Sequence, residues 1–158
     1  MNQTLTAVLA LMTATFLSIN IQQNALRSLL NSITSEYETI GGAVALDILD
    51  YVGYQEFDDV TRTTAVTDES QLTPLPFDTT QTFASADDID DFHGVTDHIY
   101  TTPYDPTEYL VDISVTYVHE DNPDSTLTTQ SFAKKVTVTV THPQLNSNVT
   151  MSQVFSYP

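Results

Sequence analysis

The chain has 158 residues, 21 of them acidic and 4 basic, which gives a formal net charge of −17 with the four histidines neutral. This balance excludes nucleic acid as a partner, because phosphate recognition needs a basic surface that four cations cannot supply. The lack of cysteine excludes disulfides, thiolate metal ligands and cysteine nucleophiles. A hydrophobic content of 41% at this length predicts one modest core rather than a disordered chain.

The charge is unevenly distributed along the chain. Residues 1–35 contain one charged side chain, Arg27, whereas all 21 carboxylates lie between Glu36 and Asp124. A net charge of this size repels itself, and salt shortens the range of the repulsion from about 10 Å at 0.1 M to about 3 Å at 1 M. The composition therefore fits either a halophilic protein or an ordinary acidic secreted protein.

The first predicted element is a long helix. Residues 5–21 contain no charge, glycine or proline, and this run is close to the length of about 20 residues that crosses a bilayer. Apolar residues continue at helical spacing through residues 26–52, and Gly53 stands where a left-handed cap would end the helix. Gly41 and Gly42 indicate either close packing by a sheet or a bend.

Three interpretations remain open for the apolar run: a single-pass membrane anchor, a helix that leaves lipid to pack against copies of itself, and a secretory signal peptide. The basic region of a signal peptide is missing, since no lysine or arginine precedes Arg27. At roughly 25 cal/mol per Å² of buried apolar surface, the run needs cover from lipid or sister subunits. The residues expected to pack in a filament core are Leu5, Val8, Leu9, Leu11, Met12, Phe16, Leu17, Ile19 and Ile21.

The second half of the chain predicts an antiparallel sheet. Residues 56–106 are polar and proline-containing, which is typical of a long loop region. Apolar and polar residues then alternate over residues 109–118, 136–141 and 149–157, which predicts three strands in a meander.

A three-stranded sheet with one apolar face needs a partner, and the amphipathic half of the helix is the one long candidate. We therefore predict an α+β fold, in which a long N-terminal helix packs its C-terminal half on a sheet of three or more antiparallel strands. Residues 1–25 would protrude as an apolar helix, and residues 26–158 would form the head. The predicted helix–sheet core consists of Leu26, Leu30, Ile33, Tyr37, Ile40, Val44, Ile48, Tyr51, Val111, Ile113, Val115, Val136, Val138 and Val140.

This layout resembles the type IV pilin and pseudopilin family. The segment ALDILDYVGYQEFDDV at residues 45–60 resembles the helix end and following turn of the family's less abundant members. The segment DDIDDFHG at residues 87–94 is similar to the Asp-rich stretch before the sheet in minor pilins of the mannose-sensitive haemagglutinin type.

The resemblance implies a structural subunit of an extracellular, pilus-like filament, with identical subunits as partners. It also implies residence in the inner membrane before assembly and dependence on an assembly machinery. Leu5 stands near the position where pilins carry a glutamate that pairs with a neighbouring subunit's amine. We therefore expect assembly through packing alone. The alternative is a single-pass, membrane-anchored minor pseudopilin, tip adhesin or binding module.

One cluster of side chains is a candidate metal site. Asp87, Asp88, Asp90 and Asp91 place four carboxylates within five residues, and oxygen-rich clusters suit Ca²⁺. The spacing does not match an EF-hand loop, because Gly94 would place isoleucine at the first ligand position. A solvated acidic loop is therefore the favoured interpretation, with Ca²⁺ as the alternative.

Motifs of catalysis are missing from the sequence. There is no Gly-x-Ser-x-Gly elbow and no phosphate-binding glycine loop among four glycines. The four histidines, His93, His98, His119 and His142, have no spacing that fixes a zinc site. The sequence therefore predicts neither an enzyme nor a resident cofactor.

Overall fold

The computed structural model describes residues 2–102 and 107–157, so Pro103 and Pro106 of the predicted loop lie outside the described residues. The backbone divides into two compact units, Met1–Tyr37 and Glu38–Pro158. This division lies later in the chain than the boundary between residues 25 and 26 that the sequence predicts. The two units are described separately.

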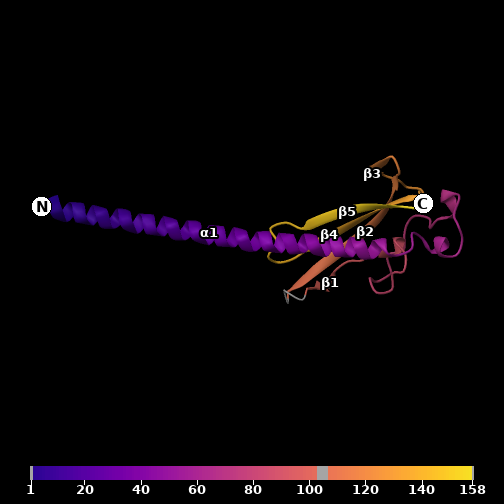
Figure 1. The fold of residues 1–158 in the computed structure, drawn as a ribbon, viewed down its shortest axis with the longest axis horizontal. Coiled ribbons are helices and arrows are strands. Elements are labelled where there is room, and N and C mark those ends of the chain that lie inside the picture. Colours follow the sequence, from indigo (N-terminus) through magenta and orange to yellow (C-terminus); the bar gives the residue numbers. More distant parts are fainter. Residues whose placement is uncertain (1, 103–106, 158) are drawn as a thin grey trace. The chain divides into compact units, whose positions relative to one another are not determined.

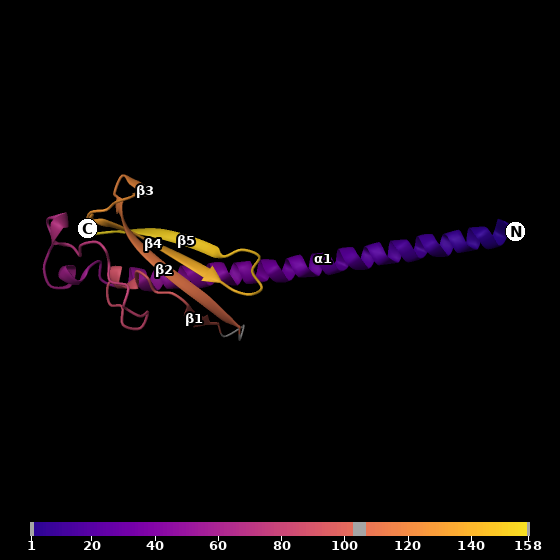
Figure 2. The same ribbon diagram turned by 180° about the vertical axis from the view of Figure 1, so that it is seen from behind.

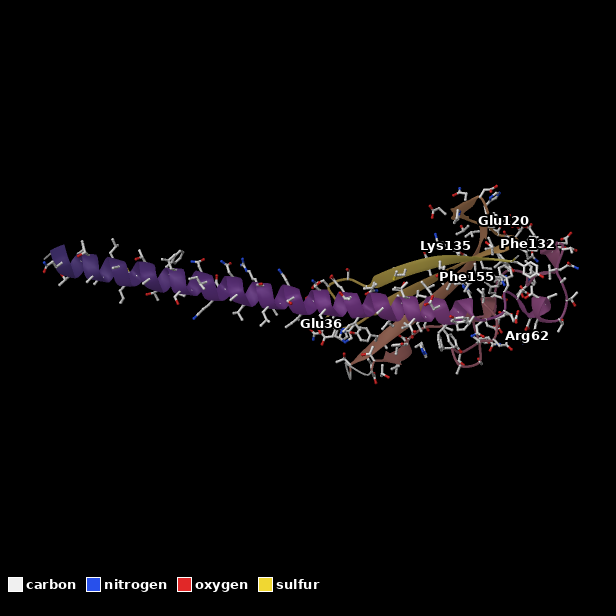
Figure 3. The ribbon with its side chains drawn as sticks, viewed as in Figure 1. Glu36, Arg62, Glu120, Phe132, Lys135 and Phe155 are labelled. Carbon is white, nitrogen blue, oxygen red and sulfur yellow. The ribbon has the colours of Figure 1, made fainter. Side chains whose placement is uncertain are left out.

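Helix α1 (Asn2–Gly53) begins in the first unit and ends in the second, at Gly53. It contains no proline, and the prediction of one uninterrupted helix is confirmed. The left-handed cap predicted at Gly53 was wrong, because this glycine is the last helical residue and its φ is not positive. A Cβ atom placed on Gly53 would lie 2.8 Å from Phe155 Cε1, so the glycine is explained by close packing on this ring instead. Side chains of the first unit stand out from the helix along its length (Figure 3). By length and composition, α1 is long and apolar enough to cross a membrane.

The second unit contains a sheet of five antiparallel strands in the order β1-β2-β4-β5, with β3 pairing to β2. The three predicted strands are β2, β4 and β5, and they form the predicted meander. The prediction did not include β1, at the end of the loop region, or β3, in the connection after β2. The bounds are β1 (His98–Thr101), β2 (Glu108–His119), β3 (Asn122–Thr126), β4 (Ala133–Thr141) and β5 (Val149–Ser156).

The C-terminal part of α1 packs on one face of this sheet, and the α+β fold class is confirmed. In Figure 1 this part of α1 passes in front of the strands, and in Figure 2, seen from behind, the strands lie in front of it. A Cβ atom placed on Gly41 would lie 3.2 Å from Val149 Cγ2, so the helix approaches β5 closely there. The buried apolar residues in this part of the helix are Val44, Ala45, Ile48, Leu49 and Val52.

The observed core is shorter at the helix end than the predicted one. The six predicted strand residues, Val111, Ile113, Val115, Val136, Val138 and Val140, are all buried, as are Val44 and Ile48. Ile40 and Tyr37 are half-buried. Tyr51 is 43% exposed, although its ring packs on Phe83 and Phe92.

Placing Leu26, Leu30 and Ile33 in this core was wrong. Their exposed fractions are 61%, 62% and 38%, and all three belong to the first unit. The physical reason is that a helical stripe of apolar residues predicts a buried face of the helix, but it does not identify the partner that buries that face. The same periodicity continues without a break across the unit boundary.

The described residues of the loop region after α1 form part of the core. They include three short 3₁₀ helices, η1 (Asp59–Arg62), η2 (Glu69–Gln71) and η3 (Asp90–Phe92). Apolar side chains from it are buried, which explains how a polar segment without periodicity folds. They are Phe57, Val66, Leu72, Phe77, Ala86, Ile89, Phe92 and Val95.

Candidate functional site

The first candidate site is the apolar surface of α1 in the first unit. The nine residues predicted for a filament core are between 48% and 74% exposed. Successive residues turn by about 100° around a helix, so Leu11, Leu17 and Ile21 lie away from the stripe made by Leu5, Val8, Leu9, Met12, Phe16 and Ile19. A helix that is apolar all round is typically one that is buried, in a protein core or in a membrane.

The polar side chains of this segment bond to the helix itself. Thr13 Oγ1 donates to Ala10 O at 2.9 Å, and Thr15 Oγ1 donates to Leu11 O at 2.5 Å. Asn20 Nδ2 donates to Phe16 O at 2.9 Å. These bonds satisfy the hydroxyl and amide donors without water, so the residues are compatible with surroundings of lipid or packed helices.

The second candidate site is a fully buried lysine in the second unit. Lys134 on β4 is 0% exposed, and its ammonium donates to Phe57 O at 2.6 Å and to Asp58 Oδ2 at 3.2 Å. It also donates to Asp90 Oδ1, and both carboxylates are buried. We call Lys134, Asp58 and Asp90 the Lys134 cluster.

Three elements bring the Lys134 cluster together. Asp58 follows the helix end and caps η1, because its Oδ1 accepts from Val60 N at 3.3 Å. Its Oδ2 also accepts from Thr73 N at 2.9 Å. Asp90 opens η3, and Lys134 lies on the strand face that packs into the core. The cluster therefore joins the loop region to the centre of the sheet.

Aromatic rings enclose the lysine. Its Nζ lies 4.5 Å from the ring centroid of Phe57, 5.8 Å from that of Phe77 and 5.4 Å from that of Tyr117. Burial raises the pKa of Tyr117, and Asp58, Asp90 and Asp88 add to the effect. The Tyr117 hydroxyl is held by donating to Thr73 O at 2.9 Å. The site is dry, aromatic and charged, a combination that needs close pairing to be stable.

The interpretation of residues 87–91 as a solvated acidic loop was wrong for two of the four carboxylates. Asp88 is 2% exposed and Asp90 is 6% exposed. Asp88 Oδ1 accepts from Asp91 N at 3.1 Å, and Asp91 Oδ2 accepts from Asp87 N at 3.2 Å. The physical reason for the difference is Lys134, which supplies a buried countercharge from a distant part of the sequence.

Burial raises the pKa of Asp88 to about 7, and the nearby charge of Asp90 contributes in the same direction. Lys134 and the Asp91 N–H act in the opposite direction but do not offset the loss of water. Near neutral pH this carboxyl is therefore protonated in a large fraction of molecules. A proton donor thus lies beside the Lys134 cluster.

The exposed end of the acidic cluster pairs with an arginine. Arg62 Nη1 lies 2.9 Å from Asp87 Oδ2 and 3.6 Å from Asp59 Oδ1. The hydrogen bond from Arg62 lowers the pKa of Asp87. Carboxylate oxygens of Asp59, Asp87 and Asp88 come within 4.8 Å of one another. Because Arg62 pairs with two of the three and Asp90 pairs with Lys134, the arrangement is one of ion pairs rather than of four ligands around a Ca²⁺ ion.

The four histidines have separate local roles. His93 Nδ1 accepts from Val115 N at 3.1 Å, and His119 Nδ1 accepts from Asp121 N at 3.2 Å. The ring of His98 stacks on Phe83 with centroids 4.0 Å apart. The structure gives no zinc geometry to these side chains.

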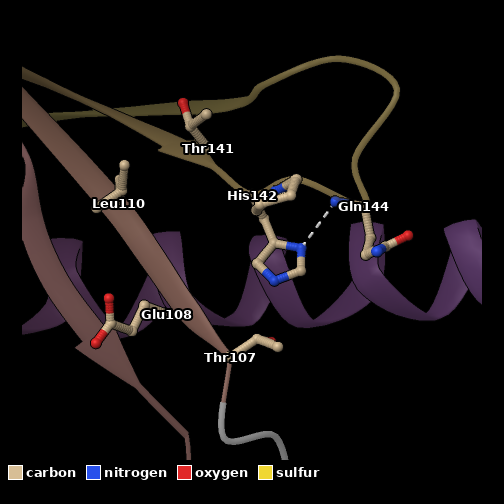
Figure 4. A pocket seen from close by; sticks show the side chains of 7 residues that line it. Thr107, Glu108, Leu110, Thr141, His142 and Gln144 are labelled. Carbon is tan, nitrogen blue, oxygen red and sulfur yellow. Dashed lines mark hydrogen bonds between the residues drawn. The ribbon is translucent and has the colours of Figure 1, made fainter.

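A concave site in the second unit lies at the end of β4. It has a volume of about 600 Å³ and is shown in Figure 4. His142 Nδ1 accepts from Gln144 N at 3.1 Å, and the His142 ring stacks on Tyr109 at 4.5 Å. This histidine shapes the turn between β4 and β5. The lining residues are Thr107, Glu108, Leu110, Thr141, His142, Pro143 and Gln144.

Sequence reasoning missed Lys134 and Asp58, although a signal for Lys134 was available. Val136, Val138 and Val140 form the buried face of β4, and strict alternation places Lys134 on that same face. A lysine on a buried face needs an anionic partner. Asp58 had no comparable signal, because its burial depends on the path of the loop.

No protein-family model, no curated protein and no solved structure matches this chain.

Proposed function

We propose that this protein is a structural subunit of an extracellular, pilus-like helical filament. In this proposal the apolar part of α1 packs against the same part of other copies, and the acidic second unit forms the outer surface. The subunit resides in the inner membrane before assembly and polymerises with its own copies through an assembly machinery. A head-to-tail contact that repeats without closing gives open helical growth.

The observation that carries the proposal is the exposure of large apolar side chains around α1. From residue 3 to residue 33, every side chain is exposed within the chain. The polar donors Thr13, Thr15 and Asn20 are satisfied by the helix itself. Such a surface is stable when lipid or other helices cover it, and both covers occur in a subunit that moves from membrane to filament.

The alternative is a single-pass, membrane-anchored minor pseudopilin, tip adhesin or binding module. The length and composition of α1, which suit a bilayer crossing, favour it as much as they favour a filament. The two functions differ in where the mature protein resides. A filament subunit is found along the length of fibres, whereas an anchored module stays in membranes or at tips.

Electron microscopy of cell-surface preparations, with antibody against the second unit, tests the proposal. We expect long, uniform fibres labelled along their length, and purified protein that sediments as polymer once detergent is removed. Purified protein that stays monomeric without detergent would overturn the proposal. Labelling confined to membranes or tips would establish the alternative.

A pair of variants connects the fibre to the helix surface. Phe16 is 69% exposed and lines a shallow hollow on α1 with Met12, Thr13 and Leu17. Phe16→Asp places a charge in the packed surface and is expected to abolish fibres. Gln22→Asp adds the same charge at a polar, exposed position of the same helix and is the matched control. Equal loss of fibres in both variants would show a general effect of charge on this segment rather than packing at Phe16.

A further inference from the structure

The Lys134 cluster places an amine and a carboxyl group in direct contact, away from water. Lys134 is 0% exposed and Asp90 is 6% exposed, and the ammonium donates to Asp90 Oδ1. Phe57, Phe77 and Tyr117 surround the nitrogen, and water has little access to it. The site thus brings together the two groups of an amide bond, in a setting that favours neutral products over ions.

We propose that Lys134 and Asp90 condense within the folded chain to form an isopeptide bond that joins β4 to η3. The inference goes beyond the proposed filament function and does not depend on it. The protein contains no cysteine, so a disulfide cannot supply a covalent cross-link. An amide between these side chains would close a covalent ring from residue 90 to residue 134.

The reaction balances without any further reagent. Lys134 loses a proton to become a neutral amine, and its Nζ forms a bond to Asp90 Cγ. One oxygen of the Asp90 carboxyl leaves as water, taking with it two protons from the amine and carboxyl groups. The sum is one ammonium and one carboxylate converted into one amide and one water, and no oxidation or reduction takes place.

Two neighbours fit the proton transfers. Asp58 Oδ2 lies 3.2 Å from Lys134 Nζ and is positioned to accept a proton from the ammonium. Asp88 precedes Asp90 by two residues, and burial raises the pKa of its carboxyl to about 7, so it holds a proton near neutral pH. The departing Asp90 oxygen needs protons in order to leave as water, and this carboxyl is a local source of them.

Asp90 is a better reaction partner than Asp58. The Asp58 carboxylate accepts a backbone N–H bond on each of its oxygens, from Val60 at 3.3 Å and from Thr73 at 2.9 Å, which hold it in place. Among the described residues, Lys134 is the one hydrogen-bond partner of the Asp90 carboxylate. The Asp90 carboxyl is therefore free of the backbone bonds that hold both oxygens of Asp58.

The fold supplies the driving force that solution lacks. In water, an ammonium and a carboxylate are well solvated and do not condense. Inside this site both ions have lost their hydration, while an amide carries no net charge and the released water returns to solvent. Holding the two groups in contact also replaces a bimolecular encounter by an intramolecular step.

Intact mass spectrometry of the denatured full-length protein tests the inference. We expect a mass lower than that of the sequence by one water molecule. Trypsin does not cleave after an acylated lysine, so residues 63–135 should be released as one peptide that lacks one water. Fragment ions from backbone cleavage between residues 90 and 134 should be missing, because the ring holds both sides together. A chain at the full sequence mass would overturn the inference.

Three variants identify the bond. Lys134→Arg should restore the full mass, and Lys135→Arg, at the neighbouring lysine that pairs with exposed Asp124, should keep the loss of water. Loss of water that persists in Lys134→Arg would indicate dehydration of an aspartate elsewhere and would overturn the inference. In Asp90→Asn, the chain should lose ammonia in place of water. Loss of water that persists in Asp90→Asn would overturn the assignment to Asp90.

Discussion

Before any reaction with Asp90, the Lys134 ammonium has no access to water, and oxygen partners on three segments stabilise it. Phe57 O, Asp58 and Asp90 each accept a hydrogen bond from its ammonium. Removal of one member of a buried ion cluster leaves the other members charged and unpaired. The resulting loss of stability is larger than the net stabilisation that the ion pair provides. Lys135, next to it on β4, pairs instead with Asp124, whose side chain is 94% exposed. The two adjacent lysines are therefore a natural test of the effect of burial.

We expect Lys134→Ala to lower the free energy of unfolding by about 3–5 kcal/mol, because it leaves Asp58 and Asp90 buried without a cation. Lys135→Ala should change it by less than about 1 kcal/mol, because its pair is exposed to solvent. Denaturant unfolding followed by circular dichroism measures both. Similar losses in the two variants would contradict the role assigned to the Lys134 cluster.

The raised pKa of Asp88 predicts how stability changes with pH. The carboxyl loses its proton near pH 3.8 in the unfolded chain and near pH 7 in the folded one. Between these values the folded state binds the proton and the unfolded state does not, so the free energy of unfolding falls as pH rises from about 4 to about 7. Desolvation of the Asp88 carboxyl is the largest cause of its raised pKa, and it acts whether Lys134 and Asp90 are ions or an amide.

Asp88→Asn replaces the carboxyl by a neutral amide that still accepts from Asp91 N. We expect the variant to be more stable than the wild-type protein at pH 8, by up to about 4 kcal/mol. Its free energy of unfolding should also change less with pH between 4 and 7. Thermal unfolding across this pH range is the measurement. Asp91→Asn, at a half-buried neighbouring carboxyl, is the comparison. An unchanged pH profile in Asp88→Asn would contradict the prediction.

Helix α1 contains two adjacent glycines with different surroundings. A Cβ atom at Gly41 would lie 3.2 Å from Val149 Cγ2 and 3.8 Å from Leu145 Cδ1, whereas one at Gly42 would have nothing within 4 Å. The prediction left open whether these residues mark close packing or a bend. Close packing at Gly41 is what the structure shows, and the helix continues through both residues.

We expect Gly42→Ala to raise the free energy of unfolding by about 1 kcal/mol, because alanine costs less than glycine in a helix interior and meets open space here. At Gly41 the same gain is opposed by contact with Val149, so Gly41→Ala should be neutral or destabilising. Thermal unfolding of the two variants measures the difference. A larger gain at Gly41 than at Gly42 would contradict the packing described for β5.

Helix and strand patterns were readable because they depend on local spacing. The extent of the helix and the strands β2, β4 and β5 follow from periods of 3.6 and 2, whereas the left-handed cap predicted at Gly53 is not formed. Strand β1 was missed because it has four residues with alternating exposure and lies at the end of a polar loop. Strand β3 was missed because its sequence, NPDST, contains residues that disfavour strands, and pairing with β2 overrides that preference.

The net charge of −17 acts on the molecule as a whole. Its 21 carboxylates all lie in residues 36–124, while the apolar run at residues 5–21 carries none of them. Repulsion among them opposes compaction, and salt screens it. The ion pairs of Arg62 and Lys135 are few and exposed. The stability lost when salt screens these pairs is therefore small compared with the stability gained when salt screens the repulsion.

We expect sodium chloride to raise the stability of the protein between 0.05 M and 1 M, by on the order of 1 kcal/mol. The measurement is the midpoint of thermal unfolding at constant pH. A triple variant, Glu69→Gln, Glu120→Gln and Asp121→Asn, removes three exposed charges and should gain less from salt. Stability that falls on addition of salt would contradict a dominant role for charge repulsion.

The sequence by itself determined the extent of the helix, its uncharged N-terminal run, the alternation of three strands and the α+β class, because each depends on residues close together in the chain. Only the tertiary structure decided that α1 contributes residues from Val44 to Val52 to the core, and that the stripe before them stays exposed. It also decided that Lys134 meets Asp58 and Asp90. Asp58 and Asp90 are 76 and 44 residues from Lys134 in the sequence, and the path of the loop brings them together. No local sequence pattern predicts that path.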